Sequence, residues 1–300
     1  MLSAGVVIPV DKPCQWTSFQ VVNKLKWLLC HSLGVKKIKI GHAGTLDPLA
    51  SGLLLVCAGN ATKQIARLQE GVKEYSGTMV LGATTPCFDL ERPIDKTFPT
   101  DHITPKAIEA SRQRFIGEIE QVPPSFSAVK VDGQRAYSTA REGEVPDIAP
   151  KKVTIYDFQV SGLRVSQGGP TPENPESPEN PESPESPENP ENPENPENPE
   201  STAEAPQKHL YRNPQGHIPP GLLLLDFTVR CGKGTYIRSL ARDFGAALGS
   251  GAFIGSLRRT HIGDYHISQA LPLIGIEQLL TPDNPAFSDF FSSFSSPQSH

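Results

Sequence analysis

One short segment, Gly41–Gly52, combines the residue types that a reactive site needs. It holds His42 and Asp47 among three glycines, between a lysine-rich approach and an apolar run. Glycines let a backbone bend sharply or pass close to a ligand. Pro48 biases Asp47 towards an extended backbone that projects its carboxylate outwards. An Asp-Pro pair is equally typical of a turn or a helix cap, so the segment alone leaves both interpretations open.

A second segment, Cys-Gly-Lys-Gly-Thr-Tyr-Ile-Arg at 231–238, has the composition of a tight turn between a strand and a helix. It superficially resembles a phosphate-binding loop, but that motif needs Ser or Thr directly after the lysine, and Gly234 follows Lys233. A nucleotide-phosphate loop is therefore excluded. The turn places Tyr236 and Arg238 at the start of a helix. Arg238 is either aimed at a cleft or an ordinary exposed arginine.

Neither Tyr75 nor His42 indicates a function by itself. A tyrosine at the start of a strand is most often a half-buried core residue with a hydrated hydroxyl. His42 has no partner at metal-ligand spacing. The cysteines are odd in number, scattered and without a C-x-x-C pair, which argues against a disulfide framework and a zinc site; they are Cys14, Cys30, Cys57, Cys87 and Cys231. We expect no metal and no cofactor.

The periodicity of the chain predicts a mixed order of strands and helices without a regular βαβ repeat. This order favours an α+β fold, with a largely antiparallel mixed sheet and flanking helices, over a doubly wound sheet. Ser18, Thr62 and Thr104 are expected to cap helices, and Asp132-Gly133 predicts a hairpin. The expected strands are 6–10, 53–57, 75–81, one around 153–158, and 222–230, and a helix opening at Gly234-Thr235 should bury Ile237, Leu240, Phe244 and Leu248.

A low-complexity repeat of Pro-Glu-Asn or Pro-Glu-Ser interrupts this pattern from Thr171 to Ser201. It holds ten Pro and ten Glu and no apolar side chain, so it has nothing to bury against its ordering entropy. We predict a disordered insert at about 166–218. A long surface loop between two strands costs little extra closure entropy, so the insert need not separate two domains.

The insert also hides the charge of the rest of the chain. The whole sequence has 28 basic and 33 acidic residues; without the ten repeat glutamates the net charge is +5 rather than −5. Basic clusters occur at 36–39 and at Arg258-Arg259, which permits a polyanionic partner without requiring one. The chain shows no secretory signal and no apolar run long enough to span a membrane. We therefore expect a cytoplasmic protein with no membrane association.

Taken together, these segments resemble the TruB family of pseudouridine synthases. The resemblance runs from about Gly5 to Tyr265 and rests on several blocks in the family's order. They are Val10-Asp11-Lys12-Pro13, Gly41–Gly52, Lys73-Glu74-Tyr75, Gln121–Lys130, Gly232–Arg238 and Leu257-Arg258-Arg259. Any one block is modest support, whereas the ordered set is specific.

The resemblance implies a role for each matching residue. Asp47 matches the aspartate that attacks the target nucleotide, so that the N-glycosidic bond opens and uracil rotates and rejoins through C5. Arg238 matches the arginine that holds this carboxylate. Tyr75 matches the tyrosine that stacks on the target base and takes part in removing the C5 proton. The remaining matches are Tyr236 and Leu257 in the uridine pocket, His42 beside the flipped nucleotide, and Lys12 as support for the site.

The chain also departs from the family pattern. Ala43 stands where many relatives have Thr, the loop Gly82–Asp89 matches loosely and receives no site, and the acidic repeat has no counterpart. We expect a pseudouridine synthase catalytic domain at 1–265. The short C-terminal extension at 266–300 is too small for the separate RNA-binding PUA domain that some relatives carry.

The expected function is isomerisation of the uridine at position 55 in the T loop of tRNA. The protein is expected to act as a monomer that binds the tRNA T stem-loop without a protein partner. One alternative is a tRNA-binding folding chaperone with little or no catalysis. Another is a glycosidase-like hydrolase that releases free uracil; the sequence shows no second carboxylate paired with Asp47, although spatial pairs are invisible in it.

Overall fold

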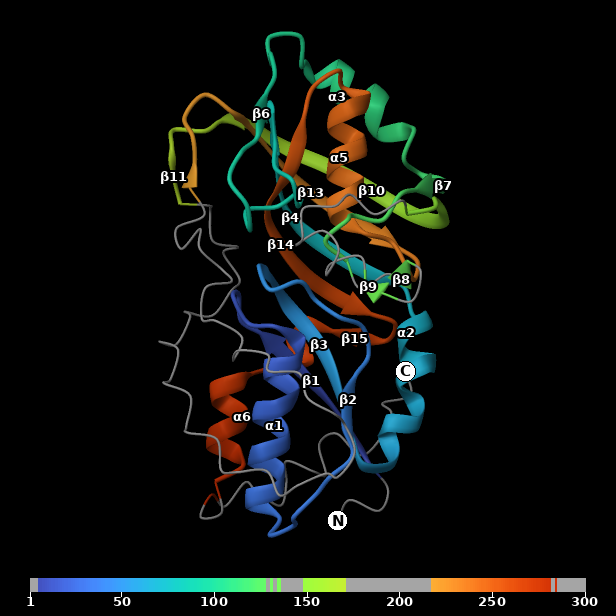
Figure 1. Cartoon of the computed structure of the whole chain (residues 1–300), viewed down its shortest axis with the longest axis vertical. Helices are drawn as coiled ribbons and strands as arrows, with labels where there is room; N and C mark the ends of the chain where they lie inside the picture. Colours follow the sequence, from blue (N-terminus) through green and yellow to red (C-terminus); the bar gives the residue numbers. More distant parts are fainter. Residues whose placement is uncertain are drawn as a thin grey trace.

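The protein is built on a ten-stranded mixed sheet (Figure 1). The computed structural model describes residues 5–127, 130–131, 134–135, 148–170, 217–281 and 284. The strand order is β16-β1-β3-β14-β4-β13-β10-β7, with β2 paired to β3 and β15 to β14. Two pairs in this sheet are parallel, β1 with β16 and β3 with β14, and the others are antiparallel. The predicted α+β class is confirmed.

The elements of this sheet and its helices have the following bounds. The strands are β1 (Val6–Lys12), β2 (Ile40–His42), β3 (Ala50–Ala58), β4 (Lys73–Leu81), β7 (Gly117–Gln121), β10 (Lys151–Val165), β13 (Leu223–Cys231), β14 (Ala252–Ile262), β15 (Tyr265–His266) and β16 (Leu271–Pro272). The helices are α1 (Ser18–Ser32), α2 (Ile65–Glu70), α3 (Pro105–Gln113), α5 (Ile237–Ala247) and α6 (Leu273–Leu279), with 3₁₀ turns at Gly59–Gln64 and Ile267–Gln269. No helix in the described ranges is long and apolar enough to cross a membrane.

Strand β3 is buried along its whole length and apolar from Leu53 to Ala58, because it is covered on both faces. Leu54 and Val56 pack in the large core cluster that contains α1, whereas Leu53 and Leu55 pack in a second cluster that reaches α2. A strand buried on both faces reads as a continuous apolar run rather than an alternating one. The apolar run at 53–57 therefore predicted a strand correctly, because β3 is buried on both faces.

Helices α1 and α5 contribute to the same large cluster from the two halves of the sheet. The first covers β1 and β3, and the second packs on β14. Figure 1 shows α1 in the lower half and α5 in the upper half. The parallel junction of β3 and β14 therefore lies between them. Ile237, Leu240, Phe244 and Leu248 are all buried, as predicted for α5.

The helix starts were predicted with mixed success. Thr104 caps α3 through the backbone N–H of Ala107, followed by a proline, as expected. The predicted cap at Ser18 is wrong by one residue: Thr17 caps α1 in a reciprocal pair with Gln20. Thr62 is no cap, because it lies inside a 3₁₀ turn that runs into α2.

The predicted hairpin is confirmed by its strands, β8 (Lys130–Val131) paired with β9 (Gln134–Arg135), although its Asp-Gly turn lies outside the described residues. The edges of the expected insert pair with each other, β11 (Gly169–Pro170) with β12 (His217–Ile218). The interior of the insert also lies outside the described residues. A further small pair joins β5 (Ala83–Thr84) to β6 (Lys96–Thr97).

The C-terminal extension adds to the edge of the sheet. Strand β16 lies parallel to β1, and Lys24 of α1 forms an ion pair of 2.7 Å with Glu277 of α6. Its apolar residues Leu273, Ile276 and Leu280 belong to the large core cluster. This part of the extension therefore packs on the half of the sheet that contains β1.

Candidate active site

Asp47 lies in the loop between β2 and β3, at the first position of a turn. Its carbonyl oxygen accepts a hydrogen bond from the backbone N–H of Ala50 at 3.1 Å, and Pro48 occupies the second position, which proline favours. Gly52, with φ +100°, follows the turn, and a Cβ there would lie 2.4 Å from the carbonyl oxygen of Arg259. Glycine is therefore required where the loop passes β14. The backbone makes a turn, and the carboxylate remains free for another role.

Arg238, the second residue of α5, holds this carboxylate from the other half of the sheet. Its Nε and Nη2 atoms donate to the two carboxylate oxygens of Asp47 at 2.8 and 2.9 Å. The guanidinium is only 5% exposed, whereas the Asp47 side chain is 37% exposed. Such a fork fixes the direction of the carboxylate as well as its charge. The structure thus aims an open carboxylate with a buried cation.

Two backbone carbonyls and one further carboxylate complete the surroundings of Arg238. Its Nη1 and Nη2 atoms donate to the carbonyl oxygens of Cys87 and Phe126 at 3.1 and 3.0 Å. Burial by itself lowers the pKa of Arg238, but the facing carboxylates of Asp47 and Asp89 raise it above its ordinary value. The guanidinium therefore stays charged at any physiological pH.

Asp89 is a site residue that sequence analysis missed. Its carboxylate lies 3.6 Å from the Nε of Arg238 and is 7% exposed. Burial raises the pKa of Asp89, and the charge of Arg238 partly opposes that rise. An aspartate in a loop after a strand is common, so its spacing gave no signal. Asp89 is therefore a second carboxylate near Asp47, since both lie against the guanidinium of Arg238. The sequence alone could not reveal this proximity.

A pocket opens beside the carboxylate. It is lined by Asp47, Leu49, Ala50, Asp89, Arg238, Ile254, Gly255, Ser256 and Leu257. Leu257 pairs with Ala50 across the parallel junction of β14 and β3. The pocket therefore lies where the two halves of the sheet meet, with charge at one side and apolar side chains at the other.

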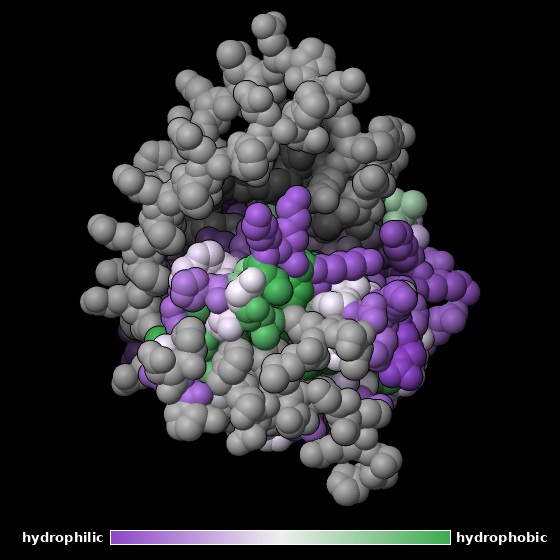
Figure 2. Space-filling view, turned by 90° about the horizontal axis from the view of Figure 1, so that it is seen from below, coloured by the Kyte–Doolittle hydropathy of each residue, from purple (hydrophilic) through white to green (hydrophobic). Residues whose placement is uncertain are grey.

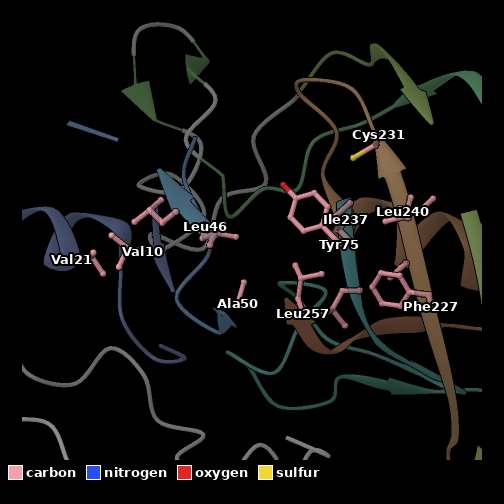
Figure 3. Packing of buried hydrophobic residues seen from close by; sticks show 14 of the residues in the cluster. Val10, Val21, Leu46, Ala50, Tyr75, Phe227, Cys231, Ile237, Leu240 and Leu257 are labelled. Carbon is pink, nitrogen blue, oxygen red and sulfur yellow. The ribbon is translucent and has the colours of Figure 1, made fainter. Parts of the chain in front are cut away.

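Tyr75 packs next to this pocket at the start of β4. It is 9% exposed and belongs to the same cluster as Leu46 and Leu257, and Figure 3 shows these residues in one part of the core. The guanidinium of Arg259 lies 6.0 Å from the centre of its ring. Burial raises the pKa of Tyr75, with Arg259 opposing. The ring is therefore neutral and held by its surroundings.

Lys12 supports the loop that carries Asp47. Its side chain is fully buried, and Nζ donates to the carbonyl oxygens of Trp16 and Pro48 at 2.6 and 3.3 Å, and to that of Pro13. Burial lowers the pKa of Lys12 to about 7, opposed by Cys14 and Asp47. One amine thus joins the end of β1 to the residue after Asp47.

The Arg258-Arg259 pair does not form a basic surface, so that part of the charge prediction is wrong. Arg258 is 3% exposed and Arg259 1%. Arg258 forms a fork with Asp11 at 2.9 and 2.8 Å. Arg259 donates to the carbonyl oxygens of Leu53 and Gly44, at either end of the Asp47 loop. From inside the protein, Arg259 supports the segment that carries Asp47, whereas Arg258 ties β14 to β1.

His42 and Tyr236 flank the site without lining the pocket. His42 lies in β2 opposite Val56, and burial followed by the charge of Arg259 lowers its pKa. Tyr236 precedes α5, and its backbone N–H donates to the side-chain oxygen of Gln121 at 2.8 Å. Burial raises the pKa of Tyr236. The structure therefore gathers Asp47, Arg238 and Leu257 at the pocket and leaves these two at its margin.

The second basic cluster of the sequence, unlike Arg258 and Arg259, lies on the surface. Lys36, Lys37 and Lys39, between α1 and β2, are exposed as the sequence predicted. The lower end of the molecule, seen in Figure 2, carries many hydrophilic side chains around a smaller apolar area. Within the described part of the chain, no three His, Cys, Asp or Glu side chains are grouped so that they could hold a metal.

The fold and the site together define an enzyme class whose open carboxylate is steadied by a buried guanidinium. The family described as TruB family pseudouridylate synthase (N terminal domain) matches residues 31–167. The tRNA pseudouridine synthase B of Flavobacterium johnsoniae is 43% identical over 92% of this chain and 96% of its own length. That of Thermobifida fusca is 37% identical over 91% of this chain and 74% of its own length. The chain belongs to the TruB family of pseudouridine synthases.

Solved structures give the same fold. The crystal structure of a Cbf5-Nop10-Gar1 complex includes a chain that is 25% identical to this one, with a TM-score of 0.54 over 93% of this chain. The structure of an H/ACA RNP bound to a substrate RNA containing 2'-deoxyuridine has a TM-score of 0.51 at 22% identity. This chain spans about half the length of those two proteins, 55% and 54%.

Proposed function

We propose that this protein isomerises the uridine at position 55 in the T loop of tRNA to pseudouridine, with Asp47 as the nucleophile. The proposal rests on one observation above all: the carboxylate of Asp47 is open to the pocket while both its oxygens are held by Arg238. The names of the curated relatives, which specify tRNA, supply the substrate class. The exposed lysines at 36–39 are suited to phosphate contacts.

The chemistry follows from the balance of the reaction. Asp47 attacks the sugar of an extruded uridine, and the N-glycosidic bond breaks with its electron pair leaving on uracil. The uracil rotates, C5 bonds to the sugar carbon, and the carboxylate is released. The C5 proton is then lost while N1 gains one, so no electrons or external groups are exchanged. Arg238 donates to both oxygens of Asp47 and so aims the carboxylate at the sugar before the attack.

The aromatic and aliphatic residues of the site would replace stacking that the uridine loses. Taking a base out of its stack costs a few kcal/mol, and Tyr75 and Leu257 offer apolar surface beside the carboxylate. We assign to Tyr75 a contact with the base and a part in removing the C5 proton, and its packing beside Leu257 in the same cluster supports this assignment. His42 and Tyr236 would contact the nucleotide from the margin of the pocket, and Lys12 keeps the loop in place.

Product analysis tests the proposal directly. The purified protein is incubated with an unmodified tRNA and with the same tRNA carrying cytidine at position 55, and the nucleosides and free bases are separated. We expect one pseudouridine per tRNA in the first RNA, none in the second, and no free uracil. Free uracil would instead indicate a hydrolase. Improved tRNA folding without any pseudouridine would indicate a chaperone, and either result would overturn the proposal.

A further inference from the structure

Two phenylalanines stand beside the Asp47–Arg238 pair without belonging to the protein core. Phe88 and Phe126 are half-buried, and neither is part of the hydrophobic clusters of the described residues. Both are tied to the site, because Arg238 donates to the carbonyl oxygen of Phe126 and to that of Cys87, the neighbour of Phe88. The two segments therefore flank the guanidinium that aims the reactive carboxylate.

Each of these rings has a guanidinium against it. Arg242 lies 5.2 Å from the centre of the Phe88 ring, and Arg92 lies 5.9 Å from that of Phe126. Arg242 follows Arg238 by one turn of α5, so both arginines lie on the same face of the helix. Aromatic rings and arginine planes are the surfaces on which proteins stack unpaired bases.

The backbone of Phe88 adds a second, independent observation. Its φ is +60°, a conformation that is unfavourable for a bulky side chain and easy for glycine. The surrounding structure enforces it, because the carbonyl oxygen of Phe88 accepts from the N–H of Ile254 at 2.9 Å and that of Asp89 from the hydroxyl of Thr85 at 2.6 Å. Strain of this kind persists where the side chain has a use.

We propose that Phe88 with Arg242, and Phe126 with Arg92, form a stacking subsite for the unpaired bases next to the target uridine. The inference rests on the proposed function and adds to it a place for the neighbouring nucleotides. Extrusion of one base deprives its neighbours of their stacking partner. Half-buried rings with adjoining cations, in the two segments whose carbonyl oxygens bind Arg238, restore that contact for any base because every base has a flat face.

The test combines variants of Phe88 with altered RNA. Phe88→Gly removes the ring and also the backbone strain of a positive φ. Phe88→Leu keeps apolar bulk without a flat face, and Phe88→Tyr keeps the ring. The KM, kcat and Kd of each are measured on a T-arm hairpin, and on hairpins with an abasic nucleotide on either side of the target. Melting temperatures are recorded for all variants, and Phe126→Leu is measured alongside.

The subsite predicts a distinct set of results. Phe88→Gly raises KM and Kd by about 5- to 150-fold, the range for one stacked base, while kcat changes little and the melting temperature is unchanged or higher. Phe88→Leu shows most of the same loss, and Phe88→Tyr stays near the unaltered protein. On one of the abasic hairpins, the KM and Kd of the unaltered protein rise by the same factor. Phe88→Gly shows no additional rise on that hairpin.

Two outcomes would overturn the subsite: unchanged KM and Kd in Phe88→Gly, or losses from the variant and the abasic RNA that simply multiply. A melting temperature lowered as much in Phe88→Gly as in Phe88→Leu would mean that the ring acts in packing instead. The Kd of the hairpin tests the subsite even when no uridine is converted. If the hairpin is bound through Phe88 but no uridine is converted, the proposed function fails and the subsite stands.

Discussion

Two arginine–aspartate forks in this molecule have the same donor–acceptor distances and different surroundings. Arg238 binds both oxygens of Asp47, and Arg258 binds both oxygens of Asp11, at 2.8–2.9 Å in each case. Both arginines are almost fully buried. The aspartate side chain is 37% exposed in the first fork and 10% exposed in the second. The difference between the two forks lies in the access of solvent to the carboxylate.

This difference separates a fork that can react from one that holds the fold. Asp11 and Arg258 connect β1 with β14 across β3, and their charges are satisfied within the protein. Removing one partner of such a buried pair leaves an uncompensated charge and is strongly destabilising. Asp47 instead presents its carboxylate to a pocket, so its loss should affect chemistry more than folding.

Among changes to the residues around the two carboxylates, the largest expected effect comes from replacing each arginine by lysine, which keeps the charge but loses the planar fork. In Arg238→Lys, we expect kcat to fall by about 100- to 1,000-fold, the order of loss when one preorganised donor is removed. In Arg258→Lys, the melting temperature should fall while kcat per folded molecule stays within about threefold, because no reacting group is touched. Steady-state kinetics and thermal unfolding of both variants give the comparison. Equal losses of kcat in the two would break it.

Lys12 sharpens the comparison through pH, because it is buried like Arg258 yet titratable. Burial lowers its pKa to about 7 from an ordinary 10.5. Between these pH values the unfolded chain holds a proton on Lys12 that the folded chain lacks. The free energy of unfolding should therefore rise as the pH increases from about 7 to 10.5, and below about pH 7 this gain in stability is absent.

The expected contribution of Lys12 over this window is on the order of a few kcal/mol. Denaturant unfolding at pH 7, 8.5 and 10 measures it, with Lys12→Met as the control in which this slope is absent. Identical slopes in the two proteins would show that Lys12 is charged in the folded state. In that case a charged ammonium group of Lys12 would donate the hydrogen bonds to the three carbonyl oxygens.

Asp89 should have an intermediate effect, because its carboxylate lies 3.6 Å from Nε of Arg238, beyond hydrogen-bond distance. Asp89→Asn keeps the size of the side chain and removes the second negative charge beside the guanidinium, so we expect kcat to fall by about tenfold. Asp95→Asn, an exposed aspartate that accepts from Thr84, is the matched control and should leave kcat unchanged. A larger loss in the control would refute a specific role for Asp89.

The smallest effect is expected from the acidic repeat. Deleting residues 171–201 should leave kcat/KM within about twofold and the melting temperature nearly unchanged, because shortening the connection between the paired strands β11 and β12 alters closure entropy only slightly. The measurements are turnover on tRNA and thermal unfolding. A large loss of either would show that the repeat contributes contacts to the folded protein.

Local signals in the sequence account for much of the fold. The unbroken apolar run of β3 and the Thr-Pro start of α3 follow from rules that act within a few residues. The cap at Thr17 was missed because two neighbouring hydroxyl residues compete for that position, and the reciprocal bond to Gln20 decides between them. Long-range contacts gave no local signal at all.

The site shows the same division. Asp47 could be singled out by its glycine-rich loop, and its pairing with Arg238, 191 residues away, followed only from the family resemblance. Asp89 was missed because its role depends on a guanidinium from another part of the chain. The burial of Arg258 and Arg259 was missed for the same reason, since their partners lie in strands that the sequence does not place together.

The central claim is that the open carboxylate of Asp47 carries the chemistry and the closed one of Asp11 does not. The direct test measures single-turnover conversion of tRNA uridine, together with tRNA binding, for Asp47→Asn and Asp11→Asn. We predict that Asp47→Asn binds tRNA within a few-fold of the unaltered protein and forms no detectable pseudouridine, whereas folded Asp11→Asn still converts uridine. Conversion by Asp47→Asn at a rate near that of the unaltered protein would contradict the account.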